Sequence, residues 1–407
     1  MNKTMVELFA GVGGVRLGFE RLQSGWKTVW FSQWEPSMKK QWAHECYVKH
    51  FGDCVDNNGE YHTNDDITIV DKNTIPTCSL LVSSHPCQNF SVASTLAHAK
   101  GLEGDKGILW WQIVDILKLK RPPFYLFENV DRMIKSPAKQ RGRDFGVILK
   151  NLSDLNYSVE WRIVNASDYG AGQRRRRIFV FAYQNNTNYA KQIRQFPIEK
   201  IFLTEGFMAK SFPVMEMGDV HEINIFDKSL ETISKDFKFD FSKAGYMTNG
   251  CIYTTVVEEQ KETSILLGDL LEETKDKKYF ITDKQKLAKW KYLKGAKKIA
   301  RKAKNGYEYT YSEGPVAFPD AWDKPGRTML TSEGTVNRSS HVVENPGNRK
   351  LRILLPIEAE RLQGFDDNWT NTGMSDRMRY FCMGNALVVP MITRMGKVLD
   401  SIVEKER

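Results

Sequence analysis

Short apolar runs alternate with amphipathic stretches over the first 185 residues of the chain. The apolar runs are rich in β-branched and aromatic residues, and they predict strands at 4–9, 28–33, 79–83, 124–127, 159–164 and 178–182. The stretches between them predict helices at 14–22, 36–51, 108–119 and 144–155. This alternation favours an α/β fold, in which a Rossmann-like, mostly parallel sheet carries helices on both faces. Ligands of such sheets bind beyond the carboxyl ends of the strands.

The alternation stops after residue 185. Residues 186–326 are polar, aromatic and rich in lysine, without a recurring strand–helix unit, and they predict a smaller, irregular α+β domain. A helix is predicted at 356–363, because Pro356 suits a first helical turn and Gly364 suits the position past its end. A last helix is predicted at 389–404. We therefore expect three segments, with 1–185 as the first domain, 186–326 as the second, and 327–407 completing the second and returning to the first.

The positive charge of the chain is concentrated in one place. The 407 residues include 59 Lys and Arg against 50 Asp and Glu, a net charge of +9. Between Lys275 and Lys304 there are thirteen Lys and Arg and two acids, a local charge of +11, so the rest of the chain is near −2. A polyanion such as a nucleic acid would explain this segment, and a solvated helix face is the simpler alternative. Interleaved aromatic residues make it more than a charged tail.

Composition excludes several classes of protein. Hydrophobic residues make up 41% of the chain and aromatic residues 12%, enough for a sizeable core. No apolar run approaches the roughly 20 residues of a membrane span. Glu7, Arg16 and Glu20 interrupt any apolar stretch that could serve as a signal peptide. The six cysteines show no close pairing, so we expect a reducing, cytoplasmic setting, no membrane association and no bound metal.

A glycine-rich turn follows the first predicted strand, with the sequence LFAGVGG at residues 8–14. Glycines there let the backbone approach a ligand, although a glycine turn without a ligand is the simpler alternative. A dinucleotide fingerprint would need a third glycine where Arg16 stands. Glu35 follows the second strand, where an acid can hold ribose hydroxyls, and Asp66 and Ile67 could meet an adenine. These residues together predict a nucleoside cofactor without a pyrophosphate cradle.

Two further motifs lie at the carboxyl ends of predicted strands. Cys87 lies in HPCQNFS just after the strand at 79–83, with Pro86 fixing the backbone before it. Three glycines follow it on a polar stretch, as expected for a loop that opens and closes. Glu128 lies in ENV at the end of the strand at 124–127, between apolar neighbours, where a carboxyl group can serve as a proton donor.

Four consecutive arginines, Arg174 to Arg177, lead into the last predicted strand of the first domain. Side chains alternate along a strand, so Arg175 and Arg177 are expected on one face and the other two on the opposite face. One such pair could clamp a phosphate or a pyrimidine oxygen.

Six motifs occur in a fixed order, namely FAGVGG, HPCQNFS, ENV, QRRRRIF, PIEAERLQGF and GNALVVP. In this the chain resembles the cytosine-5 DNA methyltransferases, of the prokaryotic restriction-modification type. The likeness covers residues 4–185 and 327–400. The target-recognition domain of that family lies between its QxRxR and RLQGF motifs, where this chain has its lysine-rich middle.

The resemblance implies a role for each matching residue. Cys87 would be the nucleophile, Glu128 would contact ring nitrogen 3 of a flipped cytosine, and Arg175 and Arg177 match two further catalytic arginines. The residues that match cofactor contacts are Phe9, Gly11, Val12, Glu35, Asp66, Ile67, Pro86, Leu109, Asn385 and Leu387. The implied cofactor is S-adenosylmethionine, with S-adenosylhomocysteine as its product. The chain departs from the family pattern at Glu7 (mostly Asp), Pro36 (often aromatic) and Ala386 (often Ser).

The activity implied is methyl transfer to carbon 5 of a cytosine that has been flipped out of duplex DNA at a specific short sequence. The modified DNA would be protected from a cognate restriction endonuclease. We expect a monomer, with double-stranded DNA as its partner, in the cytoplasm of a prokaryotic cell and associated with the nucleoid through DNA.

Three alternatives stay open at this point. A tRNA cytosine-5 methyltransferase shares the pocket but typically lacks a large recognition domain, so the segment 186–326 favours DNA. A DNA-binding protein with a dead catalytic fold is disfavoured because Cys87, Glu128 and Arg177 are all present. A nicotinamide-dependent oxidoreductase is disfavoured by the missing third glycine.

Overall fold

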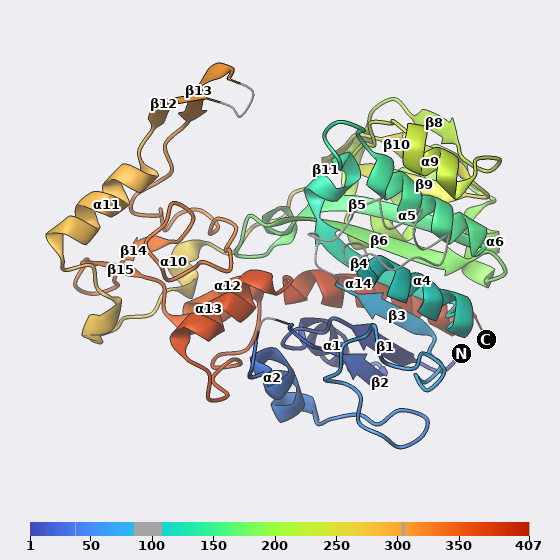
Figure 1. Cartoon of the computed structure of the whole chain (residues 1–407), viewed down its shortest axis with the longest axis horizontal. Helices are drawn as coiled ribbons and strands as arrows, with labels where there is room; N and C mark the ends of the chain where they lie inside the picture. Colours follow the sequence, from blue (N-terminus) through green and yellow to red (C-terminus); the bar gives the residue numbers. More distant parts are fainter. Residues whose placement is uncertain (37, 85–107, 303–305, 407) are drawn as a thin grey trace. The chain divides into compact units, whose positions relative to one another are not determined.

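The computed structural model describes residues 1–36, 38–84, 108–302 and 306–406 (Figure 1). It divides into two compact units. The first comprises Met1–Tyr169, Arg176–Glu262 and Leu387–Arg407, and the second comprises Gly170–Arg175 and Thr263–Ala386. Residues 186–262 therefore pack with the first unit. The boundaries of the compact units differ from those of the three segments expected from the sequence.

The first unit is built on a sheet of nine strands, ordered β2-β1-β3-β4-β6-β5-β9-β10-β8. The strands are β1 (Thr4–Leu8), β2 (Lys27–Ser32), β3 (Leu80–Ser83), β4 (Phe124–Val130), β5 (Tyr157–Asn165), β6 (Arg176–Gln184), β8 (His221–Asn224), β9 (Ala244–Thr248) and β10 (Cys251–Thr255). The four strands from β2 to β4 are parallel to one another, and the remaining pairs are antiparallel. The predicted α/β class is confirmed, with a parallel Rossmann-like part that continues as an antiparallel extension.

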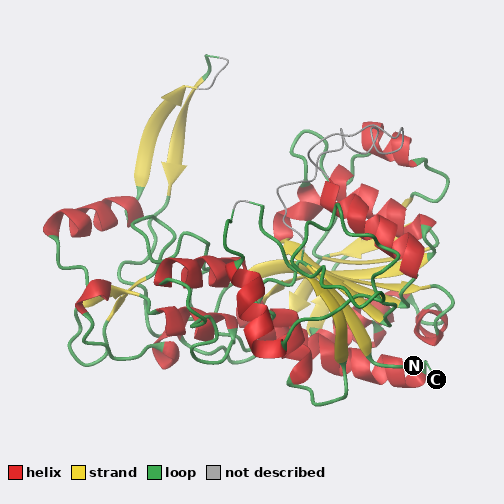
Figure 2. Ribbon diagram, turned by 60° about the horizontal axis from the view of Figure 1, so that its bottom comes forward, coloured by secondary structure: helices red, strands yellow, loops and turns green. Residues whose placement is uncertain are grey.

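Helices cover both faces of this sheet (Figure 2). The helices of the unit are α1 (Gly14–Glu20), α2 (Trp42–Phe51), α4 (Ile108–Lys120), α5 (Arg143–Asp154), α6 (Asn188–Ile193), α7 (Ile198–Lys200), α8 (Phe207–Ser211), α9 (Leu230–Asp236) and α14 (Val389–Lys405). Short helical turns lie at η2 (Asp131–Lys135), η3 (Ala166–Tyr169) and η4 (Ile201–Glu205), and a two-stranded sheet joins β7 (Val214–Met217) to β11 (Val257–Glu259).

The two faces are packed in different ways. Apolar residues of α4, α5 and α9 share one continuous core with the strands, including Ile113, Ile148 and Ile233. On the other face the Phe181 ring of β6 stacks on Phe207 of α8, with centroids 3.9 Å apart. None of the helices among the described residues is long and apolar enough to cross a membrane.

The strands β8, β9 and β10 were not predicted from the sequence. They are short, and polar residues break their apolar pattern. One packing detail explains how β9 joins the sheet beside β5. A Cβ atom at Gly245 would lie 1.8 Å from the Trp161 ring, so only glycine leaves room for that indole. The predicted strands and helices of the first 185 residues are otherwise observed, except that α2 begins at Trp42 rather than at residue 36.

The second unit contains short elements around a small core. They are α10 (Leu267–Leu270), η5 (Lys277–Tyr279), α11 (Lys284–Lys294), the hairpin β12 (Lys297–Lys302) with β13 (Glu308–Glu313), the pair β14 (Val342–Glu344) with β15 (Leu351–Ile353), α12 (Pro356–Gln363) and α13 (Asp376–Asn385). Helix α12 has the predicted bounds, and Gly364 ends it with a φ of 75°. Leu267, Val343 and Leu362 belong to the apolar core.

Candidate active site

The carboxyl ends of β1, β2 and β3 are level with one another, and β4 continues three residues further. Leu8 at the end of β1 is in register with Ser32 of β2 and with Ser83 of β3, and Ser83 is in register with Phe127 of β4. The segments that follow these strands therefore begin side by side along one edge of the sheet. These are the segments that the sequence analysis selected for the glycine turn, Glu35, Cys87 and Glu128.

The glycine turn after β1 has a left-handed backbone at three positions. The φ angles are 58° at Phe9, 57° at Gly11 and 86° at Gly13. The Ala10 amide donates to Ser32 O at 3.0 Å, which ties the turn to the end of β2. A Cβ atom at Gly11 would meet no atom of the described residues within 4 Å, so these residues leave open space beside the backbone there. The turn can thus present its backbone to a ligand.

Gln33 supports the glycine turn, and the sequence reasoning did not select it. Its side-chain Oε1 accepts a hydrogen bond from Gly11 N at 2.6 Å, and its backbone N donates to Thr63 O at 2.8 Å. The residue is 5% exposed. Gln33 therefore joins the glycine turn to the segment that carries Asp66 and Ile67. The available signal was a polar side chain at the end of a buried strand, two residues before Glu35.

The three residues expected at the nucleoside differ in their environment. Glu35 is half-buried, and burial raises the pKa of its carboxyl group. The Gln41 amide bonds both the backbone N and the backbone O of Glu35, which holds the turn after β2 and delays the start of α2. Asp66 accepts from Thr68 N at 2.9 Å through its side chain. Ile67 is 3% exposed and belongs to the core.

These positions fit a nucleoside better than a dinucleotide. No hydrogen bond or ion pair is recorded for the Glu35 carboxylate within the described part of the chain, so it is available for ribose hydroxyls. Val12 is 3% exposed, and Leu109 packs against the core, so the side chains of both can supply apolar walls. Arg16, where a third glycine would stand, lies on α1 and pairs with Glu20.

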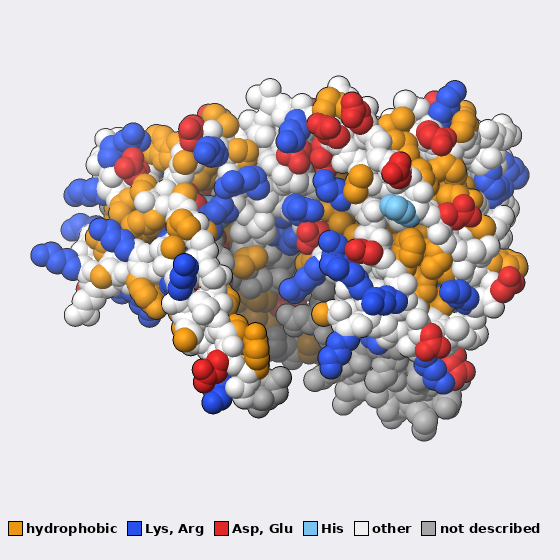
Figure 3. All heavy atoms as spheres, turned by 90° about the horizontal axis from the view of Figure 1, so that it is seen from above, with side chains coloured by type: hydrophobic (Ala, Val, Ile, Leu, Met, Phe, Trp, Pro, Cys, Tyr) orange, Lys and Arg blue, Asp and Glu red, His pale blue; other side chains and the backbone are white. Residues whose placement is uncertain are grey.

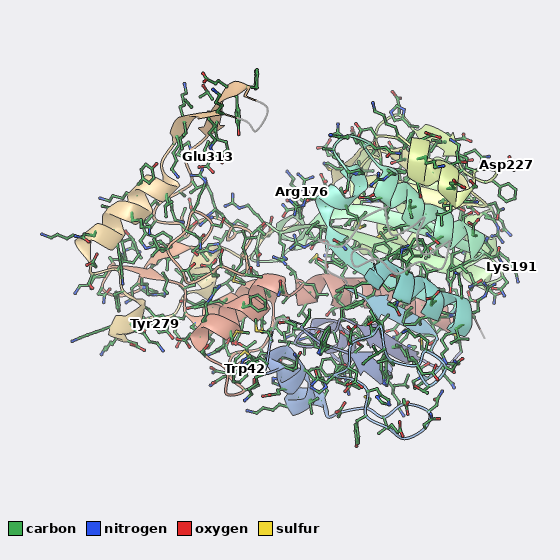
Figure 4. All side chains as sticks on the ribbon, in the orientation of Figure 1. Trp42, Arg176, Lys191, Asp227, Tyr279 and Glu313 are labelled. Carbon is green, nitrogen blue, oxygen red and sulfur yellow. The ribbon has the colours of Figure 1, made fainter. Side chains whose placement is uncertain are left out.

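Glu128 and Arg177 form an ion pair at the edge of the sheet. The Glu128 Oε1 atom of β4 lies 2.8 Å from Arg177 Nε of β6, and both side chains are mostly buried, at 14% and 16% exposure. The register places Val130 opposite Arg177, so the two side chains reach each other diagonally across adjacent strands. Arg177 also donates through Nη1 to Arg176 O. Arg176, labelled in Figure 4, is exposed and lies 3.5 Å from Asp131.

Arg175 occupies a different environment from Arg177. It is 2% exposed, it lies before the first residue of β6, and it belongs to the second unit. Its Nη1 donates to Met329 O at 2.9 Å, and its Nη2 donates to Gly384 O at 3.0 Å. The expected strand alternation of Arg175 with Arg177 is therefore wrong, because the strand starts only at Arg176.

The remaining predicted site residues are spread over the chain. Asn385 is exposed at the end of α13 in the second unit, and Leu387 is 7% exposed in the first unit. Cys87 and Pro86 lie outside the described residues. Of the five other cysteines, Cys46 and Cys382 are buried, and burial raises the pKa of Cys78 to about 12, which disfavours a reactive thiolate there. No group of His, Cys, Asp and Glu suited to a metal is found within the described ranges.

The fold and this edge define an α/β enzyme of the methyltransferase class. Residues 3–401 match the model of the C-5 cytosine-specific DNA methylases. The type II methyltransferase M.Sau3AI of Staphylococcus aureus is 45% identical over 408 residues, covering 99% of this chain and 97% of that protein. The type II methyltransferase M.DsaV of Dactylococcopsis salina is 27% identical over 399 residues, covering 98% and 86%.

A crystal structure of the S. pombe Dnmt2 methyltransferase is similar at a TM-score of 0.58 and 14% identity, covering 98% of both chains, which shows the fold alone. The chain belongs to the C-5 cytosine-specific DNA methylase family. It is a DNA cytosine-5 methyltransferase, and its family implies S-adenosylmethionine as the cofactor and DNA as the substrate.

Proposed function

We propose that this enzyme methylates one cytosine within a specific short sequence of duplex DNA, with Cys87 as nucleophile and Glu128 and Arg177 at the cytosine ring. The observation that supports this most directly is the Glu128–Arg177 pair, at 2.8 Å. It lies at the end of β4, the neighbour of β3, and β3 is the strand that leads toward Cys87.

The chemistry needs an activated ring, because carbon 5 of cytosine is a poor nucleophile. The Cys87 thiolate adds to carbon 6, which gives carbon 5 enamine character, while Glu128, in its protonated form, donates a proton or a strong hydrogen bond at ring nitrogen 3. Arg177 holds oxygen 2 and offsets negative charge nearby. Carbon 5 gains the methyl group, loses its proton to a base that we leave unassigned, and Cys87 is expelled, which restores the aromatic ring.

S-adenosylmethionine supplies the electrophilic methyl group when it is bound. In our proposal Glu35 holds its ribose hydroxyls and Asp66 with Ile67 holds its adenine, while Phe9, Gly11 and Val12 provide the first backbone contacts. Pro86, Leu109, Asn385 and Leu387 complete the set by the resemblance. The half-buried Glu35 carboxylate and the open space beside Gly11 support this assignment.

Arg175 is better supported as a positioning residue than as a catalytic one. Its guanidinium donates hydrogen bonds to the carbonyl groups of Met329 and Gly384. Gln173 acts on the same region, since it accepts from Met329 N and donates to Leu362 O. We propose that the motif QRRRRIF organises the second unit through Gln173 and Arg175, and serves the reaction through Arg177.

Helix α11 is our candidate for the main DNA backbone contact. Its residues Lys284, Lys286, Lys289 and Lys291 are exposed, and no ion pair is recorded for them within the described residues. Lys284 and Lys291 lie two turns apart on one side of the helix, and Lys286 and Lys289 lie on the other side, around an outward face that includes Tyr292. Figure 3 shows Lys and Arg side chains projecting from the surface of this unit.

Four other basic residues of the segment have acidic partners and are weaker candidates. Lys278 lies 2.8 Å from Asp376, Lys297 lies 3.6 Å from Glu313, and Lys302 lies 3.5 Å from Glu308. Lys294 is buried against Asp320 and donates to Ser340 O, and burial lowers its pKa to about 8. The unpaired lysines can release phosphate counterions, and this binding energy can offset the roughly few kcal/mol needed to flip a base out of the duplex.

We further propose that the enzyme is the modifying member of a restriction-modification pair, acting as a monomer in the cytoplasm of a prokaryotic cell and reaching the nucleoid through DNA. The type II methyltransferases among its bacterial relatives support this setting.

Bisulfite sequencing of DNA from cells that express the chain tests the function directly. We expect one methylated cytosine at every copy of a single short sequence. The purified protein should also transfer methyl groups to duplex DNA but not to tRNA. Transfer to tRNA alone would instead favour the RNA-modifying alternative.

The mechanism is tested with duplex DNA that carries 5-fluorocytosine at the target position, together with methyl donor. Fluorine cannot leave as the proton does, so a covalent adduct should accumulate, and peptide mapping should place it on Cys87. A Cys87→Ser variant should form no adduct. Unchanged activity of that variant would contradict the proposed nucleophile.

A further inference from the structure

The glycine turn is held in place by the aromatic face of α2, the helix that begins at Trp42 in Figure 4. A Cβ atom at Gly13 would lie 2.4 Å from Phe51 and 3.1 Å from Tyr47, so these two rings occupy the space beside the turn. The Tyr47 ring in turn stacks on Phe31 of β2, with centroids 3.9 Å apart. The position of Tyr47 therefore determines where the turn can lie.

The hydroxyl group of Tyr47 is bound by the buried carboxyl group of Glu7 on β1. The Tyr47 hydroxyl donates to Glu7 Oε2 at 3.2 Å, and Glu7 is 1% exposed. The other carboxyl oxygen, Oε1, has no hydrogen-bond partner within the described residues. Glu7 is on β1, two residues before Phe9, where the turn begins. A buried carboxyl group with one unsatisfied oxygen lowers the stability of the fold, so its presence calls for an explanation.

Among the described residues, few charged or titratable groups face Glu7. They are Arg16 from α1, Tyr47 from α2, and Cys54 from the loop after α2. The Arg16 guanidinium lies 4.5 Å from the centre of the Phe51 ring, and it interacts with Tyr47 as well as with Glu20, whose Oε1 atom lies 3.0 Å from Arg16 Nε. The register partners of Glu7 on β2 and β3 are the apolar residues Phe31 and Val82. The site has little to balance a negative charge.

We infer that Glu7 is a positioning residue for the cofactor: as an uncharged carboxylic acid it holds Tyr47, and through that ring it holds the glycine turn in the conformation that binds the methyl donor. This inference rests on the proposed function, because it takes the turn to be a cofactor contact. No motif assigns such a role to this position, and the sequence analysis noted only that glutamate stands there in place of the more common aspartate.

The protonation state follows from burial. Burial raises the pKa of Glu7 to about 8, against the opposing effects of the Tyr47 hydrogen bond and the Arg16 charge. Above that pH a negative charge forms beneath Tyr47 with one oxygen unpaired. The network then has to rearrange, and the turn loses its support. Cofactor affinity is therefore expected to fall as the pH rises through this range.

The test measures the dissociation constant of S-adenosylhomocysteine by calorimetry at about pH 7 and about pH 9. If only the protonated form binds, the constant for the wild type should rise about tenfold, the loss of competent protein expected for a group that titrates midway. Glu7→Gln keeps the shape without the titration, so its constant should stay within about twofold between the two pH values. Glu20→Gln removes an exposed carboxylate from the same arginine and should follow the wild type.

Equal pH dependence of the wild type and Glu7→Gln would overturn the inference. Absence of binding by the wild type at either pH would instead point to a wrong cofactor. The hydrogen-bond network of Glu7 and Tyr47 can also be tested without a ligand, by thermal unfolding of the wild type and Glu7→Gln at several pH values. Because the folded pKa lies above the ordinary value, the wild type should lose stability relative to Glu7→Gln as the pH rises from about 5 to about 8, and the difference should be constant above. A difference that is constant over the whole range would contradict the network.

Discussion

Arg175 and Arg177 are two residues apart in the sequence, yet their surroundings have nothing in common. Arg177 lies on β6 and pairs with Glu128, whereas Arg175 precedes the strand and binds the carbonyl groups of Met329 and Gly384. A run of four arginines carries no internal signal of this division. The point at which the chain enters the sheet decides it.

Replacing Glu128 by Gln is expected to lower kcat by about 10²–10⁴-fold, because the amide cannot donate a proton at ring nitrogen 3. Affinity for DNA should change little. Asp131→Asn provides the matched control, since Asp131 lies just after the same strand and pairs with the exposed Arg176. Methyl transfer under single-turnover conditions measures both variants. Equal losses in the two would place the effect in the local fold rather than in the chemistry.

The turn between β1 and α1 shows how one element depends on its neighbour. Gly13 and Gly25 have nearly the same backbone, with φ of 86° and 87°, but only Gly13 is crowded by Phe51 and Tyr47. Their replacement by alanine therefore separates backbone strain from steric displacement.

Gly25→Ala is expected to cost about 1–2 kcal/mol of stability, from the left-handed backbone alone. Gly13→Ala should cost more, and it should also weaken S-adenosylhomocysteine binding, because the new methyl group pushes the turn away from α2. Thermal unfolding and calorimetry measure the two effects. Normal cofactor affinity in Gly13→Ala would contradict the role given to this turn.

Helix α12 carries the motif PIEAERLQGF, and the acids of this motif have structural roles. Glu358 forms a fully buried bidentate pair with Arg352, at 2.6 and 2.8 Å, and accepts from Leu355 N at the start of the helix. Glu360 accepts from Arg379 and from Thr370. These contacts join α12 to α13 and to β15 within the second unit.

Glu358→Gln leaves the buried Arg352 without its counter-charge, and we expect a loss of about 3–5 kcal/mol in the free energy of unfolding. Asp367→Asn removes an acid from the partly exposed pair with Arg361 near the end of the same helix, and it should cost less than about 1 kcal/mol. Urea denaturation compares the two. Similar losses would show that the buried pair contributes no more than the exposed one.

The positive charge of the whole chain is concentrated in the segment that we propose to bind DNA. The net charge of +9 is more than accounted for by the segment from Lys275 to Lys304, and α11 holds four of its exposed lysines. Replacement of Lys284, Lys286, Lys289 and Lys291 by alanine should therefore reduce the salt dependence of DNA binding. If each contacts one phosphate, the slope of log K against log salt concentration falls by about 3–4.

The same four positions changed to arginine provide the control, because the charge is kept and the slope should be kept with it. Binding is measured by fluorescence anisotropy over roughly 50–200 mM salt. An alanine variant with the wild-type slope would remove α11 from the DNA interface.

The amino-acid pattern alone determined much of this enzyme. The alternation of apolar runs located β1 to β6, because strands that are buried on both faces must be almost wholly apolar, and Pro356 with Gly364 marked the two ends of α12. The order of the motifs identified the family. The roles given to Cys87 and to the cofactor contacts stay predictions.

Only the tertiary structure decided the features that depend on contacts between distant residues. The strand β9 joins the sheet beside β5 because Gly245 makes room for Trp161, a fit that no local pattern contains. Gln33 holds the glycine turn, and Arg175 binds carbonyl groups far along the sequence. The buried state of Glu7 likewise comes from Tyr47 and Phe31, which surround it only after folding. Local sequence sets periodicity, whereas burial and hydrogen-bond partners depend on which segments meet in space.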